Sequence, residues 1–223
     1  MSEAGGKNVV LKTLAYAAGF FGISYLFYKL YFLRTPSRKI PNNNQVFVSP
    51  ANGRVLSVRK FNSESFIETK DSPITERGAI KILTSDVASS GTVITIKLQI
   101  TDVHYQRAPI AGKVISLDYV QGSFKNAVFV PQEQGSRYEN EHNSILLETE
   151  SGLRYKVVQI AGFVARVIES MVTPLQIVNQ GDIIGLIKLG SQVTVILPAS
   201  VAVMVKEGDL LIDGETIIGK LIL

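Results

Sequence analysis

Two hydrophobic patterns divide the chain. A mostly apolar segment covers residues 9–33, and residues 13–28 within it carry no charge. As a helix this segment would be roughly 37 Å long, which is enough to cross a bilayer. After residue 45 the pattern changes to short β-branched runs separated by turn residues, as is typical of strands. The sequence therefore predicts an N-terminal helix followed by a mainly β domain.

The flanks of the apolar segment favour a single-pass membrane anchor over 9–33. Lys12 and Lys29 bound the uncharged stretch, where long side chains reach lipid headgroups. An aromatic belt near its C-terminal end is formed by Tyr25, Tyr28, Tyr31 and Phe32. A cleavable signal peptide and a buried core helix are the alternatives, although no clear small-residue cleavage site follows the segment. Basic residues are more frequent after the segment than before it, which predicts a cytoplasmic location for the β domain.

The remainder of the chain is expected to form a tail (1–8), a Pro/Asn-rich linker (34–45) and one domain (46–223). Strands are predicted at 46–61, 91–100, 112–120, 143–150 and 154–162. Residues 163–171, FVARVIESM, favour a short helix instead.

Two internal echoes indicate duplication. SPANGRV (49–55) and APIAGKV (108–114) share Pro-x-x-Gly-basic-Val, and QGDIIG (180–185) resembles DGETIIG (213–219). Each echo places a glycine-led turn between short strands. The expected architecture is a compact β-sandwich or hybrid barrel of duplicated short-strand hairpins with few short helices.

The composition narrows the chemistry. The chain has no Cys, and its histidines are His104 and His142, so thiolate chemistry is excluded and no metal site is expected. The formal net charge is +4, and no basic stripe interleaved with aromatics stands out. Nucleic acid is therefore not an expected partner.

One predicted strand contains an interruption that suits covalent chemistry. In LIKLGSQVTVILP (186–198), Gly190-Ser191 breaks an apolar run. A glycine in a strand marks a bulge or a close backbone approach, and it leaves its own carbonyl open to attack. Serine is a weak nucleophile unless a base takes its proton. The pair is therefore either a simple bulge or a reactive site.

Six motifs in order give the chain a family resemblance. They are VSPANGRV, DVHYQRAPIAGKV, ENEHN, QIAGFVAR, QGDIIGLIKLGSQVTVILP and VKEGDLLIDGETIIG. Together they cover roughly residues 36–220 and resemble the short form of phosphatidylserine decarboxylase, including archaetidylserine-type relatives. Any single motif is weak, because Pro-x-x-Gly-x-Val also occurs in lipoyl-type carrier domains, but the ordered set is specific.

The resemblance implies a proenzyme that cuts itself between Gly190 and Ser191. The Ser191 hydroxyl would attack the Gly190 carbonyl, and elimination would convert Ser191 into a pyruvoyl group. The products would be a β chain (1–190) and an α chain (191–223). The pyruvoyl cofactor would form a Schiff base with the serine headgroup of a phospholipid and accept electrons as CO2 leaves.

The resemblance also assigns candidate roles to side chains. His104 would protonate the product carbanion and could also serve as the base for self-cleavage. Arg107 and Arg166 are candidate ligands of the lipid phosphate, with solvated surface charge as the alternative for each. His142 is interpreted as structural or exposed.

Asn52 departs from the family pattern, which has Asp in SPxDGxV. That carboxylate orients and charges the self-cleavage base, whereas an amide cannot stabilise an imidazolium by charge; the same exchange in serine hydrolases costs about 10⁴ in rate. Three explanations stay open: an engineered change, a natural slow or inactive homologue, and deamidation of Asn52-Gly53 to Asp.

The leading hypothesis is thus a membrane-anchored, pyruvoyl-dependent serine-phospholipid decarboxylase made as a proenzyme. The alternative is a catalytically impaired relative that binds lipid. A lipoyl-type carrier modified at Lys113 is a third, less favoured option. The lipid backbone and a homodimer both remain open.

Overall fold

The computed structural model describes residues 2–62, 83–121, 141–161, 167–188 and 192–222, with side chains from Leu11 onward. The chain forms two compact units, Met1–Pro36 and Ser37–Leu223.

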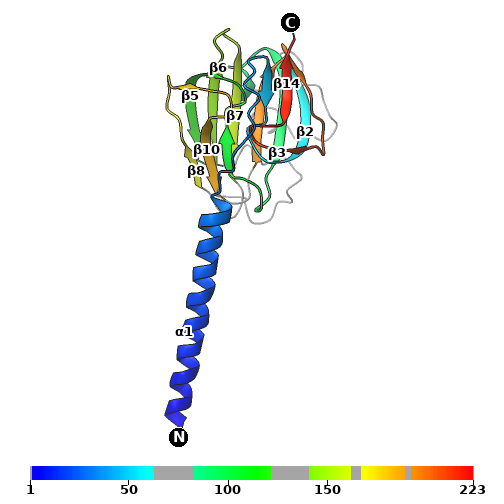
Figure 1. The fold of residues 1–223 in the computed structure, drawn as a ribbon. Helices are drawn as coiled ribbons and strands as arrows, with labels where there is room; N and C mark the ends of the chain where they lie inside the picture. The colour runs from blue at the N-terminus through cyan, green and yellow to red at the C-terminus, as the bar shows by residue number, and fades with distance from the viewer. Residues whose placement is uncertain (1, 63–82, 122–140, 162–166, 189–191, 223) are drawn as a thin grey trace. The chain divides into compact units, whose positions relative to one another are not determined.

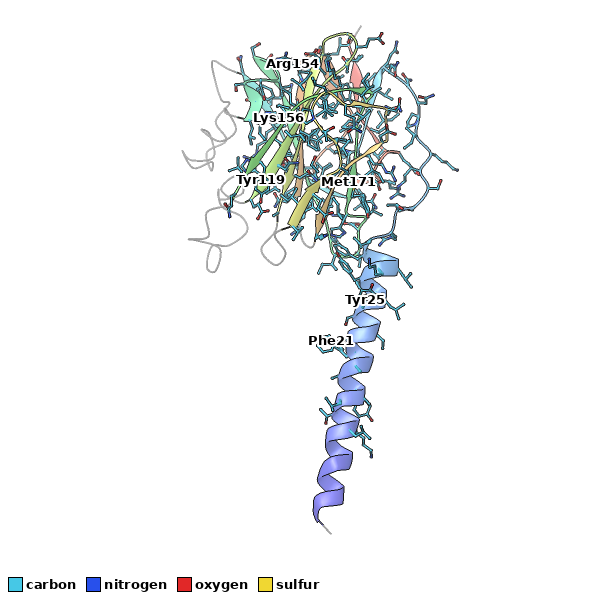
Figure 2. All side chains as sticks on the ribbon, turned by 90° about the vertical axis from the view of Figure 1, so that its left-hand side faces the viewer. Phe21, Tyr25, Tyr119, Arg154, Lys156 and Met171 are labelled. Atoms are coloured by element: carbon cyan, nitrogen blue, oxygen red, sulfur yellow. The ribbon has the colours of Figure 1, made fainter. Side chains whose placement is uncertain are left out.

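The N-terminal unit is helical. The α-helix α1 covers Ser2–Phe27, and a π-helix continues it over Tyr28–Phe32. Large apolar side chains are exposed along its length, including Phe21 at 71% and Tyr25 at 63%, both labelled in Figure 2. Of the helical residues described with side chains, none belong to a helix that is both long enough and apolar enough to cross a membrane. The predicted membrane-spanning helix over 9–33 is therefore not supported by the structure.

The second unit is mainly β, as predicted. Its described strands form an eight-stranded sheet in the order β13-β2-β3-β11-β7-β6-β5-β9 and two three-stranded sheets, β1-β14-β12 and β4-β10-β8. The seven strands at the two ends of this unit's sequence are β1 (Val46–Val48), β2 (Gly53–Asn62), β3 (Ser90–Lys97), β11 (Gln192–Pro198), β12 (Val201–Val203), β13 (Leu210–Leu211) and β14 (Ile217–Leu221). The other seven are β4 (Tyr105–Arg107), β5 (Gly112–Val120), β6 (His142–Glu148), β7 (Arg154–Ile160), β8 (Val167–Ser170), β9 (Ile177–Val178) and β10 (Ile183–Lys188).

Most predicted strands are confirmed with small shifts, and β5 covers the predicted 112–120. The predicted strand 46–61 is two strands, because the chain bends at 49–52 between β1 and β2. The short helix predicted at 163–171 is wrong in its described part. Residues Val167–Ser170 form β8, which pairs antiparallel with β10, and the β-branched Val167 and Ile168 suit that pairing.

The strand order reads as a duplication. In the eight-stranded sheet, β13-β2-β3-β11 on one side mirrors β9-β5-β6-β7 on the other. The sheet β1-β14-β12 likewise corresponds to β4-β10-β8. Even the bulges match, since register shifts fall at Val55/Ser57 in β2 and at Val114/Ser116 in β5. We call β1–β3 with β11–β14 the split repeat, and β4–β10 the continuous repeat. Figure 1 shows β5 to β8 and β10 on one side of this unit, and β2, β3 and β14 on the other.

Backbone hydrogen bonds between the sequence echoes support the same relation. The Val48 N–H donates to the Pro109 carbonyl and the Arg107 N–H to the Pro50 carbonyl, both at 2.9 Å. The turn glycines Gly181 and Gly214 both have positive φ, +86° and +73°. That conformation favours glycine, which explains why each echo contains one. The predicted duplication is therefore present, but the echo turns are not hairpins, because each one joins two strands that pair with other strands.

The core of the unit lies where the sheets meet. Its largest cluster of buried apolar side chains includes Phe47, Ile94, Val157 and Ile187, drawn from both repeats. Burying each such side chain contributes about 1.5–3 kcal/mol. Phe47 packs edge-on against Tyr155, with ring centroids 5.5 Å apart.

The way the repeats are connected positions the candidate site. The continuous repeat is inserted between β3 and β11 of the split repeat, so the chain leaves at 98–104 and returns through 189–191. Lys97 pairs with Gln192 at one end of these two connections, and Tyr105 pairs with Leu186 at the other. Both connections therefore link the same two pairs of strand ends.

Candidate functional site

His104 lies at the end of the outgoing connection and is fully buried. Its carbonyl accepts a hydrogen bond from the N–H of Ile187 at 3.1 Å, which fixes it beside the end of β10. Ile187 is followed in the sequence, four residues later, by Ser191. The histidine is therefore held next to the strand that leads into the predicted cleavage motif.

A local turn sets the tautomer of His104. The Asp102 carboxylate accepts from the N–H of Gln99 at 2.7 Å, and the Asp102 N–H donates to the Gln99 carbonyl at 3.0 Å. Nδ1 of His104 lies 2.9 Å from the Asp102 carbonyl oxygen. Because a carbonyl oxygen can only accept, Nδ1 carries the proton, and Nε2 of the neutral ring then carries the lone pair. The ring is thus arranged as a base at Nε2.

Asn52 lies in a second cluster, around Asp213. Its side-chain oxygen Oδ1 accepts from the backbone N–H of Asp213 at 2.8 Å and from Nη2 of Arg38 at 3.2 Å. The Asp102 carbonyl, and not the Asn52 side chain, accepts the Nδ1 proton of His104. The described hydrogen bond at Nδ1 of His104 is therefore made by Asp102 and does not involve Asn52.

Asp213 is the anionic centre of that cluster. Its carboxylate is fully buried and pairs with the guanidinium of Arg38 and with Nε of Arg107, the latter at 2.6 Å. Nη1 of Arg107 also donates to the Gly181 carbonyl at 2.8 Å. The two arginine side chains, each 12% exposed, give this largely buried cluster one excess positive charge. A buried carboxylate needs such pairing, since its desolvation is otherwise very costly.

Three predicted site residues, Gly190, Ser191 and Arg166, lie outside the described residues. The structure describes the strand ends on either side of the predicted cut, Lys188 of β10 and Gln192 of β11. His142, interpreted from sequence as structural or exposed, is buried on β6 at 7% exposure. Among the described residues, no group of three or more metal-ligating side chains comes together.

Sequence reasoning missed Asp213, Arg38 and Asp102 as site residues. Asp213 opens the DGETIIG echo, which was interpreted as a turn, and Asp102 stands in the motif that contains His104. The signal available for Asp213 was its place before a left-handed glycine. Its arginine partners are far away in sequence, so the buried ion pairs could not have been inferred.

Comparison with known proteins agrees with the motif order. The family model described as phosphatidylserine decarboxylase matches residues 27–219. A phosphatidylserine decarboxylase proenzyme of Desulfotalea psychrophila is 36% identical over 195 residues, covering 87% of this chain and 80% of the relative. One from Chlorobaculum tepidum is 33% identical and covers 99% of this chain and 86% of the relative. A Methanocaldococcus jannaschii protein whose name contains "archaetidylserine decarboxylase proenzyme" is 36% identical over 87% of this chain and 90% of its own length.

Proposed function

The chain belongs to the phosphatidylserine decarboxylase family of pyruvoyl-dependent carboxy-lyases, and we propose that it is a proenzyme that cuts itself at Gly190-Ser191 and then decarboxylates a serine phospholipid. The observation that carries the proposal is the geometry of His104. It is buried, its Nδ1 proton is engaged by Asp102, and its backbone is bonded to the strand that leads to the predicted cut.

Self-cleavage needs a base and no oxidant. Nε2 of His104 takes the hydroxyl proton of Ser191, whose oxygen bonds to the Gly190 carbonyl carbon; the Gly190–Ser191 C–N bond breaks and the Ser191 nitrogen takes up that proton. Elimination then removes the Cα proton of residue 191, breaks its Cβ–O bond and releases the Gly190 carboxylate. Water replaces the nitrogen of the resulting dehydroalanine, so one water is consumed and one ammonia leaves. His104 is the residue type that this proton transfer requires.

The described residues fit the group that this reaction produces. A buried histidine with a basic Nε2 lies beside the incoming strand, where it can return a proton to the product. Once formed, the pyruvoyl group supplies an electron sink for loss of CO2, which no side chain provides.

The two product chains are expected to stay together. The α chain would contribute β11, which is paired on both sides, with β3 and β7. It would also contribute β14, which lies between β1 and β12. Removing it would take β11 out of the middle of the eight-stranded sheet and β14 out of the middle of a three-stranded sheet, so the cut is expected to leave a single folded unit.

Arginine is the proposed recognition element for the lipid phosphate. Arg166 and Arg107 are the candidates, because a guanidinium binds phosphate through paired hydrogen bonds. Nε of Arg107 is paired with Asp213 in the described structure. We therefore expect Arg107 to act as part of the Asp213 cluster and not as an isolated cation.

The N-terminal helix is the proposed membrane-anchoring element. It exposes large apolar side chains such as Phe20, Ile23 and Leu30, each at about 70%. A lipid surface would remove them from water and bring the second unit to its substrate. Flotation of full-length chain and of a chain lacking residues 1–33 with serine-phospholipid vesicles tests this, and equal flotation of both would contradict it.

Intact mass of the purified chain tests the processing step. A fragment starting at residue 191, with a blocked N-terminus sensitive to carbonyl reagents, is expected, and Ser191→Ala should abolish it. A chain that stays uncut, alone and as Asn52→Asp, would overturn the proposal.

Asn52→Asp is a useful variant because it keeps an oxygen acceptor at the position of Asn52 Oδ1. Both partners of Asn52 Oδ1 are hydrogen-bond donors, and donors suit a carboxylate at least as well as an amide. Cleavage that appears only in Asn52→Asp would show that Asn52 prevents self-cleavage in the parent chain. The alternative of a non-catalytic lipid-binding relative is not favoured, because the similar proteins are named as proenzymes.

A further inference from the structure

Three buried amide side chains form a hydrogen-bonded chain that ends at His104. Nδ2 of Asn143 donates to Oε1 of Gln159 at 2.8 Å, and Nε2 of Gln159 donates to Oε1 of Gln106 at 2.7 Å. Nε2 of Gln106 then donates to the carbonyl oxygen of His104 at 2.7 Å. Gln106 and Gln159 are fully buried and Asn143 is 4% exposed.

The His104 carbonyl fixes the donor-to-acceptor direction of these three amide hydrogen bonds. The His104 carbonyl can only accept, so the amide NH2 of Gln106 must face it, and each following amide must take the same orientation. The same carbonyl accepts the N–H of Ile187, so both of its lone pairs are engaged. Hydrogen bonds aligned in this way polarise one another in a buried site.

The split repeat provides an internal control, because the equivalent positions are known from strand register. Gln106 pairs with Gly185 as Phe47 pairs with Gly219, and Asn143 pairs with Gln159 as Thr92 pairs with Leu197. The amides Gln106, Gln159 and Asn143 thus correspond to Phe47, Leu197 and Thr92. The same backbone is held in the split repeat by mainly apolar packing.

The fold therefore does not require amides at these positions. Burying an amide costs free energy unless it is hydrogen-bonded, and apolar side chains at equivalent sites avoid that cost. A glycine at position 185 also leaves space for the hydrogen-bonded amides. A Cβ on Gly185 would lie 2.4 Å from Nε2 of Gln159, so glycine at 185 is needed for the amide to fit. The corresponding Gly219 faces Val201 and Leu197 instead.

We infer that Gln106, Gln159 and Asn143 are positioning residues for His104. They hold the His104 carbonyl in one orientation, which fixes the backbone from Asp102 to His104 and with it the bond from Nδ1 to the Asp102 carbonyl. That bond keeps the basic lone pair on Nε2. This inference rests on the proposed role of His104 in self-cleavage and adds the residues that set its tautomer.

The test measures tautomer and cleavage separately. In the full chain carrying Ser191→Ala, which cannot cut itself, ¹⁵N NMR of the imidazoles reports the tautomer of His104; a His142→Gln chain identifies the other histidine signal. Cleavage rates are measured in the chain with Ser191 intact. The variants are Gln106→Leu, Gln159→Leu and Asn143→Thr, the last matching the split repeat. Thr92→Val is the matched control, since it removes a buried polar group from the equivalent position.

The expected effect is largest at Gln106 and smallest at Asn143. Gln106→Leu should give a mixture of His104 tautomers and slow self-cleavage about 10- to 100-fold, because misplacing a base by about 1 Å has an effect of that order. Thr92→Val should leave both readouts unchanged. If Gln106→Leu fails to fold, Asn143→Thr provides the test in its place, because the split repeat already has threonine at the equivalent position 92.

A single Nδ1–H tautomer in all three amide variants would overturn the inference. Slower cleavage that followed only the loss of thermal stability, in Thr92→Val as in the amide variants, would overturn it as well. If the parent chain never cuts itself, the proposed function fails, while the tautomer measurement in the Ser191→Ala chain still decides the role of the amides.

Discussion

The two repeats of the β unit have the same strand order and register but different interiors. The split repeat places Phe47, Leu197 and Val193 where the continuous repeat places Gln106, Gln159 and Tyr155. His104 itself corresponds to the exposed Gln45, since the Gln45 carbonyl accepts from Leu221 as the His104 carbonyl accepts from Ile187. One copy of the fold is thus stabilised by apolar packing, and the other carries buried polar groups.

This difference separates what the architecture needs from what the site needs. Apolar residues at a position in one repeat show that the backbone there is stable without hydrogen-bonding side chains. A polar residue at the matching position therefore requires another explanation, and for the amides that explanation is His104. The same reasoning gives the variants at His104, Asp213 and Gly185 a counterpart in the other repeat.

The largest expected effect is at His104. His104→Ala should slow self-cleavage by about 10²–10⁴-fold, because general base catalysis contributes that much. Gln45→Ala, at the equivalent position, should cut at the parental rate. Both are measured by the appearance of the short fragment on denaturing gels over time. Equal rates in the two variants would remove His104 from the reaction.

Asp213 should matter more for stability than its counterpart Gln180. Asp213→Asn removes the anionic partner of Arg38 and Arg107 and should lower the free energy of unfolding by about 3–5 kcal/mol. Gln180→Ala leaves the Val46 and Pro109 carbonyls without its Nε2–H and should cost about 1–3 kcal/mol. Chemical denaturation measures both, with the half-buried Glu215→Gln as control, since glutamine keeps an oxygen that can accept the Lys39 N–H. The interpretation of Asp213 as a charged centre fails if Gln180→Ala is the more damaging change.

Gly185 and Gly219 offer a matched pair. A methyl group at Gly185 would meet the Gln159 amide at 2.4 Å, and one at Gly219 would meet Cγ1 of Val201 at 2.7 Å. Each alanine variant should lose about 1–3 kcal/mol of stability through overpacking. Gly185→Ala should also slow self-cleavage by more than its loss of stability explains, whereas Gly219→Ala should not. Parallel thermal melts and cleavage assays separate the two effects, and identical behaviour would argue against the amide chain.

The smallest effect concerns Tyr155, whose hydroxyl donates to the Ile110 carbonyl at 2.6 Å. Burial raises the pKa of this phenol well above its usual value of 10.0. The unfolded chain therefore releases the proton as pH rises past about 10 while the folded chain keeps it. Its stability contribution is complete below pH 10 and falls above it, by about 1.4 kcal/mol per pH unit.

Tyr155→Phe should cost about 1 kcal/mol at pH 7 and should flatten the decline above pH 10. Tyr119→Phe is the comparison, because its pKa is raised mainly by a hydrogen bond to Glu141 and its side chain is exposed. Urea unfolding at pH 7 to 11 gives both curves. An undiminished decline in Tyr155→Phe would show that other groups cause it.

The local features of the fold were predictable from sequence. The β-branched runs gave β5 and, with small shifts, β3, β6 and β7. The two pairs of echoes predicted the duplication, because turns with left-handed glycines depend on residues close together in the chain. The helix predicted at 163–171 is wrong at Val167–Ser170, whose pairing with β10 is not visible in the local sequence.

The candidate site was predictable in part. His104 was predicted from its motif, and the structure shows that it is buried just before β4, the first strand of the continuous repeat. Gly190, Ser191 and Arg166 lie outside the described residues and remain predictions. Asn52 was predicted as a site residue because it stands where the family has the Asp that orients the self-cleavage base; its described partners are the Asp213 N–H and Arg38, and its role stays a prediction. No local pattern could have shown that Asp213 would meet Arg38 and Arg107 from distant parts of the chain.

The sequence by itself determined the family, the mainly β class and the duplicated turns, and it predicts a reactive Gly190-Ser191 pair, because motifs and turn conformations are specified by neighbouring residues. The tertiary structure decided which distant groups meet. Insertion of one repeat into the other makes 98–104 and 189–191 connect the same strand ends, and strand register aligns Gln106, Gln159 and Asn143 behind His104. Such contacts depend on long-range pairing and burial.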